Sequence, residues 1–159
     1  MRMKYMRTKA FTLIELLIVI SIIGILSSFA FFGTTSSQKQ ARDAQRKSDL
    51  RQYQTSIENF ANKGNSLFPG ENAFVIANTE LCSDLGLTSC PVDPKKVSQP
   101  TYEDYKYQTD GTVGTGAAVA TKYVLWAKLE NSTNYWVVCS DGKIGTKASV
   151  SGAGGVCPI

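Results

Sequence analysis

The sequence predicts an α+β protein in which a long N-terminal helix precedes a small antiparallel sheet. Three patterns support this prediction. Residues 11–33 form an apolar run, and residues 38–62 repeat apolar side chains at steps of three and four. The segments beyond residue 101 are rich in aromatic and β-branched side chains that partly alternate. We expect the amphipathic half of the helix to pack on three or four strands and the hydrophobic half to protrude.

The apolar run, FTLIELLIVISIIGILSSFAFFG, carries a single charge at Glu15. At 1.5 Å per residue it would extend roughly 35 Å as a helix, enough to cross a membrane with some tilt. An acid inside such a helix costs about 2.5–3.5 kcal/mol on insertion scales, so Glu15 should have a partner. A free α-amino group at Phe11 would be a suitable cation if the chain were cut before that residue.

This N-terminus, with a basic leader, a small residue and then Phe-Thr-Leu-Ile-Glu, resembles the class III signal of type IV pilins and type II secretion pseudopilins. The resemblance implies cleavage between Ala10 and Phe11 by a prepilin peptidase, which also N-methylates Phe11. It further implies that Glu15 pairs with the Phe11 amine of a neighbouring subunit during assembly. The family usually has glycine before the cut, and Ala10 is the next smallest residue.

The resemblance divides the chain into three parts. Residues 1–10 would be the leader, residues 11–35 the transmembrane and polymerisation helix, and residues 36–159 the head domain with the amphipathic half of the stem helix. A secretory signal cleaved after Ala30 is an alternative, but an acid in its apolar core would be unusual. The leader contains four of the 17 basic residues, so the mature chain would carry 13 basic and 13 acidic residues. The basic leader predicts a head outside the cytoplasm, and the neutral mature chain gives no reason to expect a specific nucleic-acid partner.

The amphipathic segment should continue the apolar helix to about 50 residues and end near Gly64. Its apolar stripe consists of Ala41, Ala44, Leu50, Tyr53, Ile57, Phe60 and Ala61. The charged residues lie mostly off this stripe, which predicts a solvated or subunit-facing surface made of Arg42, Asp43, Arg46, Lys47, Asp49 and Arg51.

After a connecting region with short helical or irregular pieces, the strands are expected at residues 102–109, 122–130 and 134–140. A short fourth strand could begin at residue 143, after an Asp-Gly turn. One face of this meander should lie on the stem helix. We expect that face to include Tyr123, Leu125, Tyr135 and Val137.

The chain contains no histidine, which excludes Ser-His and Cys-His catalysis and the commonest metal ligand. We predict no catalytic residue, no cofactor and no metal site. Four cysteines in an exported domain favour disulfides, and three pairings are possible. Pairing near neighbours gives Cys82–Cys90 and Cys139–Cys157, and the second bridge resembles the C-terminal disulfide loop of pilins.

These features predict a structural subunit of a type IV pilus-like surface filament rather than an enzyme. The expected partners are copies of the same chain in a helical homopolymer, the prepilin peptidase, the pilus assembly platform and, before assembly, the membrane. The precursor would be a single-pass protein of the cytoplasmic or inner membrane, and the mature protein would lie in the extracellular filament. The alternatives are a pseudopilin of a type II secretion or DNA-uptake system and a membrane-anchored binding module.

Overall fold

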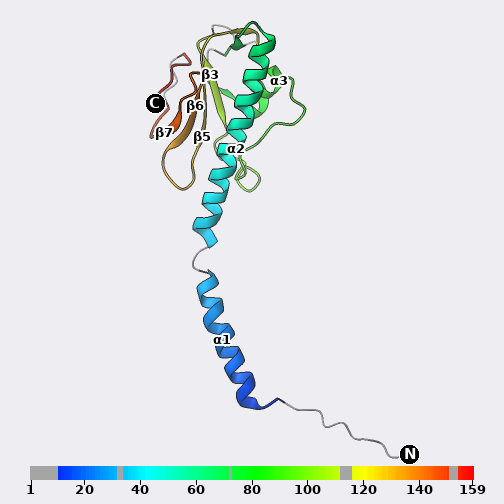
Figure 1. Ribbon diagram of the computed structural model, residues 1–159, viewed down its shortest axis with the longest axis vertical. Helices are drawn as coiled ribbons and strands as arrows, with labels where there is room; N and C mark the ends of the chain where they lie inside the picture. Colours follow the sequence, from blue (N-terminus) through cyan, green and yellow to red (C-terminus); the bar gives the residue numbers. More distant parts are fainter. Residues whose placement is uncertain (1–10, 32–33, 72, 112–115, 151–153) are drawn as a thin grey trace, which may run out of the picture. The chain divides into compact units, whose positions relative to one another are not determined.

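The computed structural model describes residues 11–31, 34–71, 73–111, 116–150 and 154–159 (Figure 1). The chain divides into two compact units, Met1–Gln38 and Lys39–Ile159. The leader, including Ala10, lies outside the described residues. So do residues 32–33, where the two halves of the expected stem helix would join.

The first unit contains helix α1, Leu13–Phe31, whose sequence is dominated by isoleucine and leucine. A capping box begins it. The Glu15 N–H donates to Thr12 Oγ1 at 3.3 Å, and the Glu15 carboxylate accepts the Thr12 N–H at 2.8 Å. Within the described part of the chain, no helix combines the length and apolar character needed to cross a membrane.

Helix α2, Thr34–Lys63, supplies the helical side of the head core. The apolar stripe is confirmed from its middle onward, where Leu50, Tyr53 and Ile57 are fully buried. The predicted stripe begins too early in the chain, because its first two members, Ala41 and Ala44, are exposed. After α2 the chain turns through residues 64–66, and the Ser66 N–H donates to the carbonyl of residue 61 at 2.9 Å.

The head contains a five-stranded antiparallel sheet in the order β2-β3-β5-β6-β7 (Figure 1). Its strands are β2 (Val75–Ile76), β3 (Lys106–Thr109), β5 (Tyr123–Lys128), β6 (Tyr135–Cys139) and β7 (Ile144–Lys147). The last four correspond to the predicted meander, and β2 adds an edge strand. A separate two-stranded ribbon pairs β1 (Phe68–Pro69) with β4 (Ala118–Ala120). The connection between β2 and β3 contains a π-helical turn, η1 (Ala77–Leu81), and a helical turn, α3 (Cys82–Asp84).

The strand register corrects the predicted assignment of side chains to faces. Tyr123 and Leu125 pack with α2, as expected, but Val138 opposes Leu125 and therefore shares that face. Val137 and Tyr135 point to the opposite face, where they pack with Trp126. A one-residue error in phase moves every side chain of a strand to the other face, and that phase depends on the β5–β6 pairing.

The outer face of the sheet is covered by the C-terminal segment. The buried residues of this face are Val124, Trp126, Val137 and Cys139. The partly buried residues that the C-terminal segment packs on them are Val150, Cys157 and Ile159. The sheet therefore has apolar contacts on both faces, which explains why nearly every residue of β5 is buried.

Candidate assembly site

The start of α1 presents a carboxylate beside the predicted new N-terminus. Both Thr12 donors, the backbone N–H at 2.8 Å and the hydroxyl at 3.0 Å, reach the same oxygen of Glu15, Oε2. A carboxylate has two oxygens with about four acceptor positions, so these bonds fix its position and leave capacity for a further donor. The Thr-x-x-Glu spacing is the sequence signal for this capping box, and it lies within the Phe-Thr-Leu-Ile-Glu segment.

The rest of α1 is apolar all around its axis. The large side chains of the helix are each about half or more exposed: Leu13, Ile14, Leu16, Leu17, Ile18, Val19, Ile20, Ile22, Ile23, Ile25 and Leu26. Two serines, Ser21 and Ser28, donate their hydroxyls to backbone carbonyls one turn earlier, so these polar groups are satisfied within the helix. A surface of this kind requires an apolar environment, either lipid or other helices.

Comparison with known proteins identifies the class of this N-terminus. Residues 5–31 match the family model of the prokaryotic N-terminal methylation motif. The chain therefore carries the prepilin-type signal of type IV pilins and pseudopilins, and its long N-terminal helix followed by antiparallel sheets fits a pilin-like fold. No curated protein and no solved structure matches the chain.

The motif implies processing by a prepilin peptidase and assembly into a pilus-type structure, and it marks a structural class of protein that is typically non-enzymatic. The finer assignments remain predictions: cleavage between Ala10 and Phe11, N-methylation of Phe11, and pairing of Glu15 between subunits. Phe11 and Glu15 are described, and both are exposed at the start of the helix.

The head contains an ion network that sequence reasoning missed. Arg46 was predicted to lie on a solvated or subunit-facing surface, but its side chain is fully buried. Its Nε and Nη2 atoms donate to the two carboxylate oxygens of Asp93 at 2.6 and 2.9 Å, and Nη1 donates to Asp43 at 2.7 Å. Burial lowers the pKa of Arg46, but the hydrogen bonds to the two aspartates outweigh it and raise that pKa above its ordinary value.

The same network holds the β5–β6 loop. Asp43 accepts the backbone N–H groups of Glu130 and Asn131 at 2.8 and 2.9 Å. Arg42 forms a bidentate pair with Glu130, both bonds being 2.7 Å long. The Arg42 hydrogen bonds are the main cause that lowers the pKa of Glu130 to about 2. One turn of α2 therefore fixes the loop that joins two central strands.

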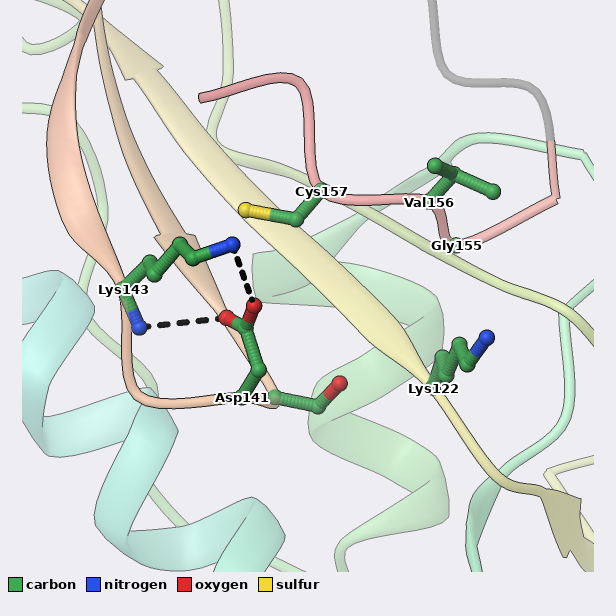
Figure 2. Close-up of a pocket in the computed structure, with 7 residues that line it drawn as sticks. Lys122, Asp141, Lys143, Gly155, Val156 and Cys157 are labelled. Carbon is green, nitrogen blue, oxygen red and sulfur yellow. Dashed lines mark hydrogen bonds and ion pairs between the residues drawn. The ribbon is translucent and has the colours of Figure 1, made fainter.

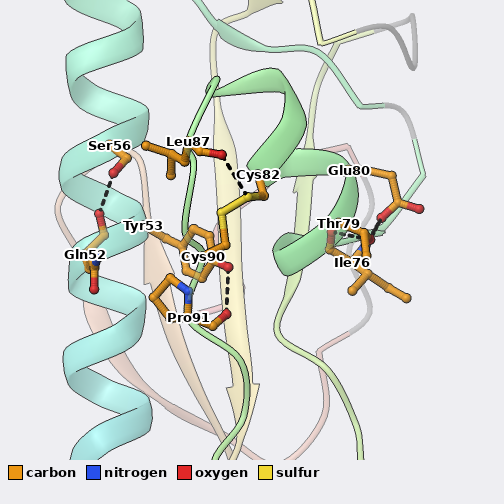
Figure 3. Close-up of a disulfide and its surroundings, with 10 residues drawn as sticks. All are labelled: Gln52, Tyr53, Ser56, Ile76, Thr79, Glu80, Cys82, Leu87, Cys90 and Pro91. Carbon is orange, nitrogen blue, oxygen red and sulfur yellow. Dashed lines mark hydrogen bonds between the residues drawn. A yellow bond between two sulfur atoms is a disulfide. The ribbon is translucent and has the colours of Figure 1, made fainter.

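Both predicted disulfides are present, Cys82–Cys90 and Cys139–Cys157, and the described residues include no free cysteine. Figure 3 shows how the first bridge lies against α2, where the Tyr53 hydroxyl donates to the carbonyl of Pro91 at 2.8 Å. Tyr53 thereby ties the stem helix to the disulfide loop.

The second bridge borders a surface hollow of about 270 Å³ (Figure 2). Its lining residues are Lys122, Ser140, Asp141, Lys143, Gly155, Val156 and Cys157. The Asp141 carboxylate accepts the Lys143 N–H and pairs with its ammonium group, both at 3.1 Å. Asp141 approaches the sulfurs of Cys139 and Cys157. Those sulfurs are joined to each other, so they cannot act as thiolate ligands. The predicted Asp-Gly turn is confirmed by the positive φ of Gly142, 82°.

Proposed function

We propose that this protein is a structural subunit of a type IV pilus-like surface filament, made as a membrane-anchored precursor and processed by a prepilin peptidase. One observation carries the proposal. The methylation motif at residues 5–31 coincides with an apolar helix whose sole charged residue is Glu15. The function is polymerisation, and α1 is the element that polymerises.

The chemistry of assembly follows from the new N-terminus. Cleavage before Phe11 creates an α-amino group, which is largely protonated near neutral pH and keeps its charge when methylated. Glu15 offers a carboxylate whose position is fixed by Thr12. In an apolar surrounding, opposite charges attract far more strongly than in water, so an amine of one subunit and Glu15 of the next would set the register of docking.

The apolar surface of α1 supports the same proposal. Moving it from lipid into a bundle of sister helices changes little in hydrophobic free energy, because both surroundings are apolar. The charge pair then supplies the preference for one register, and close packing between the helices supplies the attraction that holds them together. The disulfide-bonded head, with two bridges in the described residues, suits an oxidising exterior.

The test is the recovery of filaments from cells that express Glu15→Gln, which keeps the shape of the side chain and removes its charge. We expect the variant to be processed and to remain in the membrane fraction while sheared filaments fall at least tenfold. Glu58→Gln is the matched control, because Glu58 is an exposed glutamate on α2, and it should assemble normally. Normal filaments from Glu15→Gln would refute the assembly role of the charge.

A further inference from the structure

A pair of carboxyl groups lies inside the head, away from the assembly helix. Glu71, which follows β1, is only 7% exposed, and its carboxyl group hydrogen bonds to that of Asp84 at the end of α3. The second oxygen of Asp84, Oδ2, is buried and has no hydrogen-bond partner. The two residues belong to different elements, so their contact joins the β1 end of the ribbon to α3 and the Cys82–Cys90 loop.

Thr109 fixes the backbone of Glu71, and the backbone of Gly116 lies against the carboxyl group of Asp84. The Glu71 N–H donates to Thr109 Oγ1 at 2.7 Å, and the Thr109 hydroxyl donates back to the Glu71 carbonyl at 3.0 Å. On the other side, a Cβ added to Gly116 would lie 2.1 Å from Asp84 Oδ1, so the backbone there closes directly over the carboxyl group.

A hydrogen bond between two carboxyl groups requires a proton. Ionised carboxylates only accept hydrogen bonds, so the pair must retain one proton to remain in contact. Glu71 is the member that holds it. Burial, followed by the charge of Asp84, raises the pKa of Glu71 to about 7. Burial also raises the pKa of Asp84, but the hydrogen bond from Glu71 acts in the opposite direction.

The neighbouring ionisable groups favour the protonated pair. Glu80 of η1 adds a negative charge that raises the pKa of both Glu71 and Asp84. Tyr107 of β3 is a neutral phenol whose hydroxyl donates to the carbonyl of Pro69 at 2.9 Å. Burial is the main cause that raises the pKa of Tyr107, and the charges of Glu71, Asp84 and Asp110 add to it, which places Asp110 in the same acidic neighbourhood.

We propose that Glu71 and Asp84 form a proton-dependent latch that holds α3 and its disulfide loop against the β1–β4 ribbon in acid and releases them as the pH rises through neutrality. The closed latch binds one proton more than the open form between the ordinary pKa of a glutamate, 4.5, and its value in the fold, about 7. Opening therefore becomes about tenfold more favourable per pH unit in this window, and levels off above it.

Amide hydrogen exchange of the full chain in detergent micelles tests the latch, with the disulfides intact and EDTA present so that no divalent cation replaces the proton. The reporters are the amides of Leu85, Gly86 and Leu87, which donate to carbonyls within residues 81–83 (Figure 3 shows this loop). After correction for intrinsic exchange, their opening constants should rise about 40-fold from pH 5 to pH 7, because the two ends of this interval lie close to the two pKa values. The amides of the β5–β6 pair should not change in this way.

Glu71→Gln supplies the decisive comparison, because its amide donates to Asp84 without a titrating proton. This variant should lose the pH dependence of α3 exchange, while the exposed Glu58→Gln control should retain it. Asp84→Asn should only reduce it, because the charge of Asp84 is removed while burial still raises the pKa of Glu71. A wild-type opening constant that does not change between pH 5 and pH 7 would overturn the proposal. So would an unchanged pH dependence in Glu71→Gln. Filament assembly is not part of the readout, so either result leaves the proposed function to its own test.

Discussion

Arg46→Met should destabilise the head more than any ordinary surface substitution. The substitution keeps an unbranched side chain of similar length and removes a guanidinium group that is fully buried. Three charged hydrogen bonds are lost, two to Asp93 and one to Asp43. Asp93 is itself 1% exposed and would keep one donor, the backbone N–H of Lys95 at 2.8 Å.

The size of the stability loss in Arg46→Met follows from the aspartate charge that remains buried. Breaking a buried ion pair by removing one partner costs about 3–5 kcal/mol, because the other charge stays buried without its counter-charge. Replacing both partners with apolar residues is often close to neutral. We therefore expect Arg46→Met to lower the free energy of unfolding by about 3–5 kcal/mol, and Arg46→Met combined with Asp93→Leu to recover most of the loss.

Urea unfolding of the detergent-solubilised full chain at pH 7 measures this difference, with fluorescence as the signal. Both tryptophans, Trp126 and Trp136, lie in strands of the head, so the signal reports on that unit. Arg51→Met is the matched control, because Arg51 is an exposed arginine on the same helix, and its effect should stay within about 0.5 kcal/mol. If Arg46→Met costs no more than Arg51→Met, the buried network does not stabilise the head as argued.

Two further predictions concern the loss of stability at low pH and the packing of the C-terminal segment. Since the pKa of Glu130 is lowered to about 2, its stabilising contribution is complete above pH 4.5 and is lost as the pH falls toward 2. The stability difference between wild type and Arg42→Ala should therefore shrink across that window in urea titrations, and a constant difference would contradict it. Gly154 and Gly155 both have positive φ, but only a Cβ at Gly155 would meet backbone atoms, at 2.7 Å. Gly155→Ala should cost about 1–3 kcal/mol more than Gly154→Ala by thermal unfolding, and equal costs would exclude the packing argument.

The features that the sequence predicted correctly depend on local patterns. The apolar run, the second half of the amphipathic stripe and the meander strands each follow from the spacing of neighbouring side chains. The prepilin-type signal is equally local, because Phe11, Thr12 and Glu15 lie within five residues of one another. Pairing each cysteine with its near neighbour in the sequence predicted both disulfides correctly, because both bridges close short loops with separations of 8 and 18 residues.

The features that it missed depend on residues far apart in the chain. Arg46 is buried because Asp93, 47 positions away, meets it with a bidentate carboxylate, and no pattern on α2 reveals that partner. Glu71 and Asp84 belong to the region between α2 and β3, and no spacing pattern in the sequence links them. The predicted face of Val137 was wrong because the pairing of β6 with β5 decides which side chains of β6 point to each face. The residues of β6 do not determine that pairing by themselves.

The most direct test of the central claim is intact mass and N-terminal peptide mapping of this protein in sheared surface filaments, measured beside the membrane fraction. The account predicts a chain that begins at N-methylated Phe11 and is abundant in the filaments. The same mature chain found only in membranes would replace the pilus role with that of a pseudopilin. A chain that starts after Ala30, or one that retains Met1, would contradict assembly through a processed N-terminal helix.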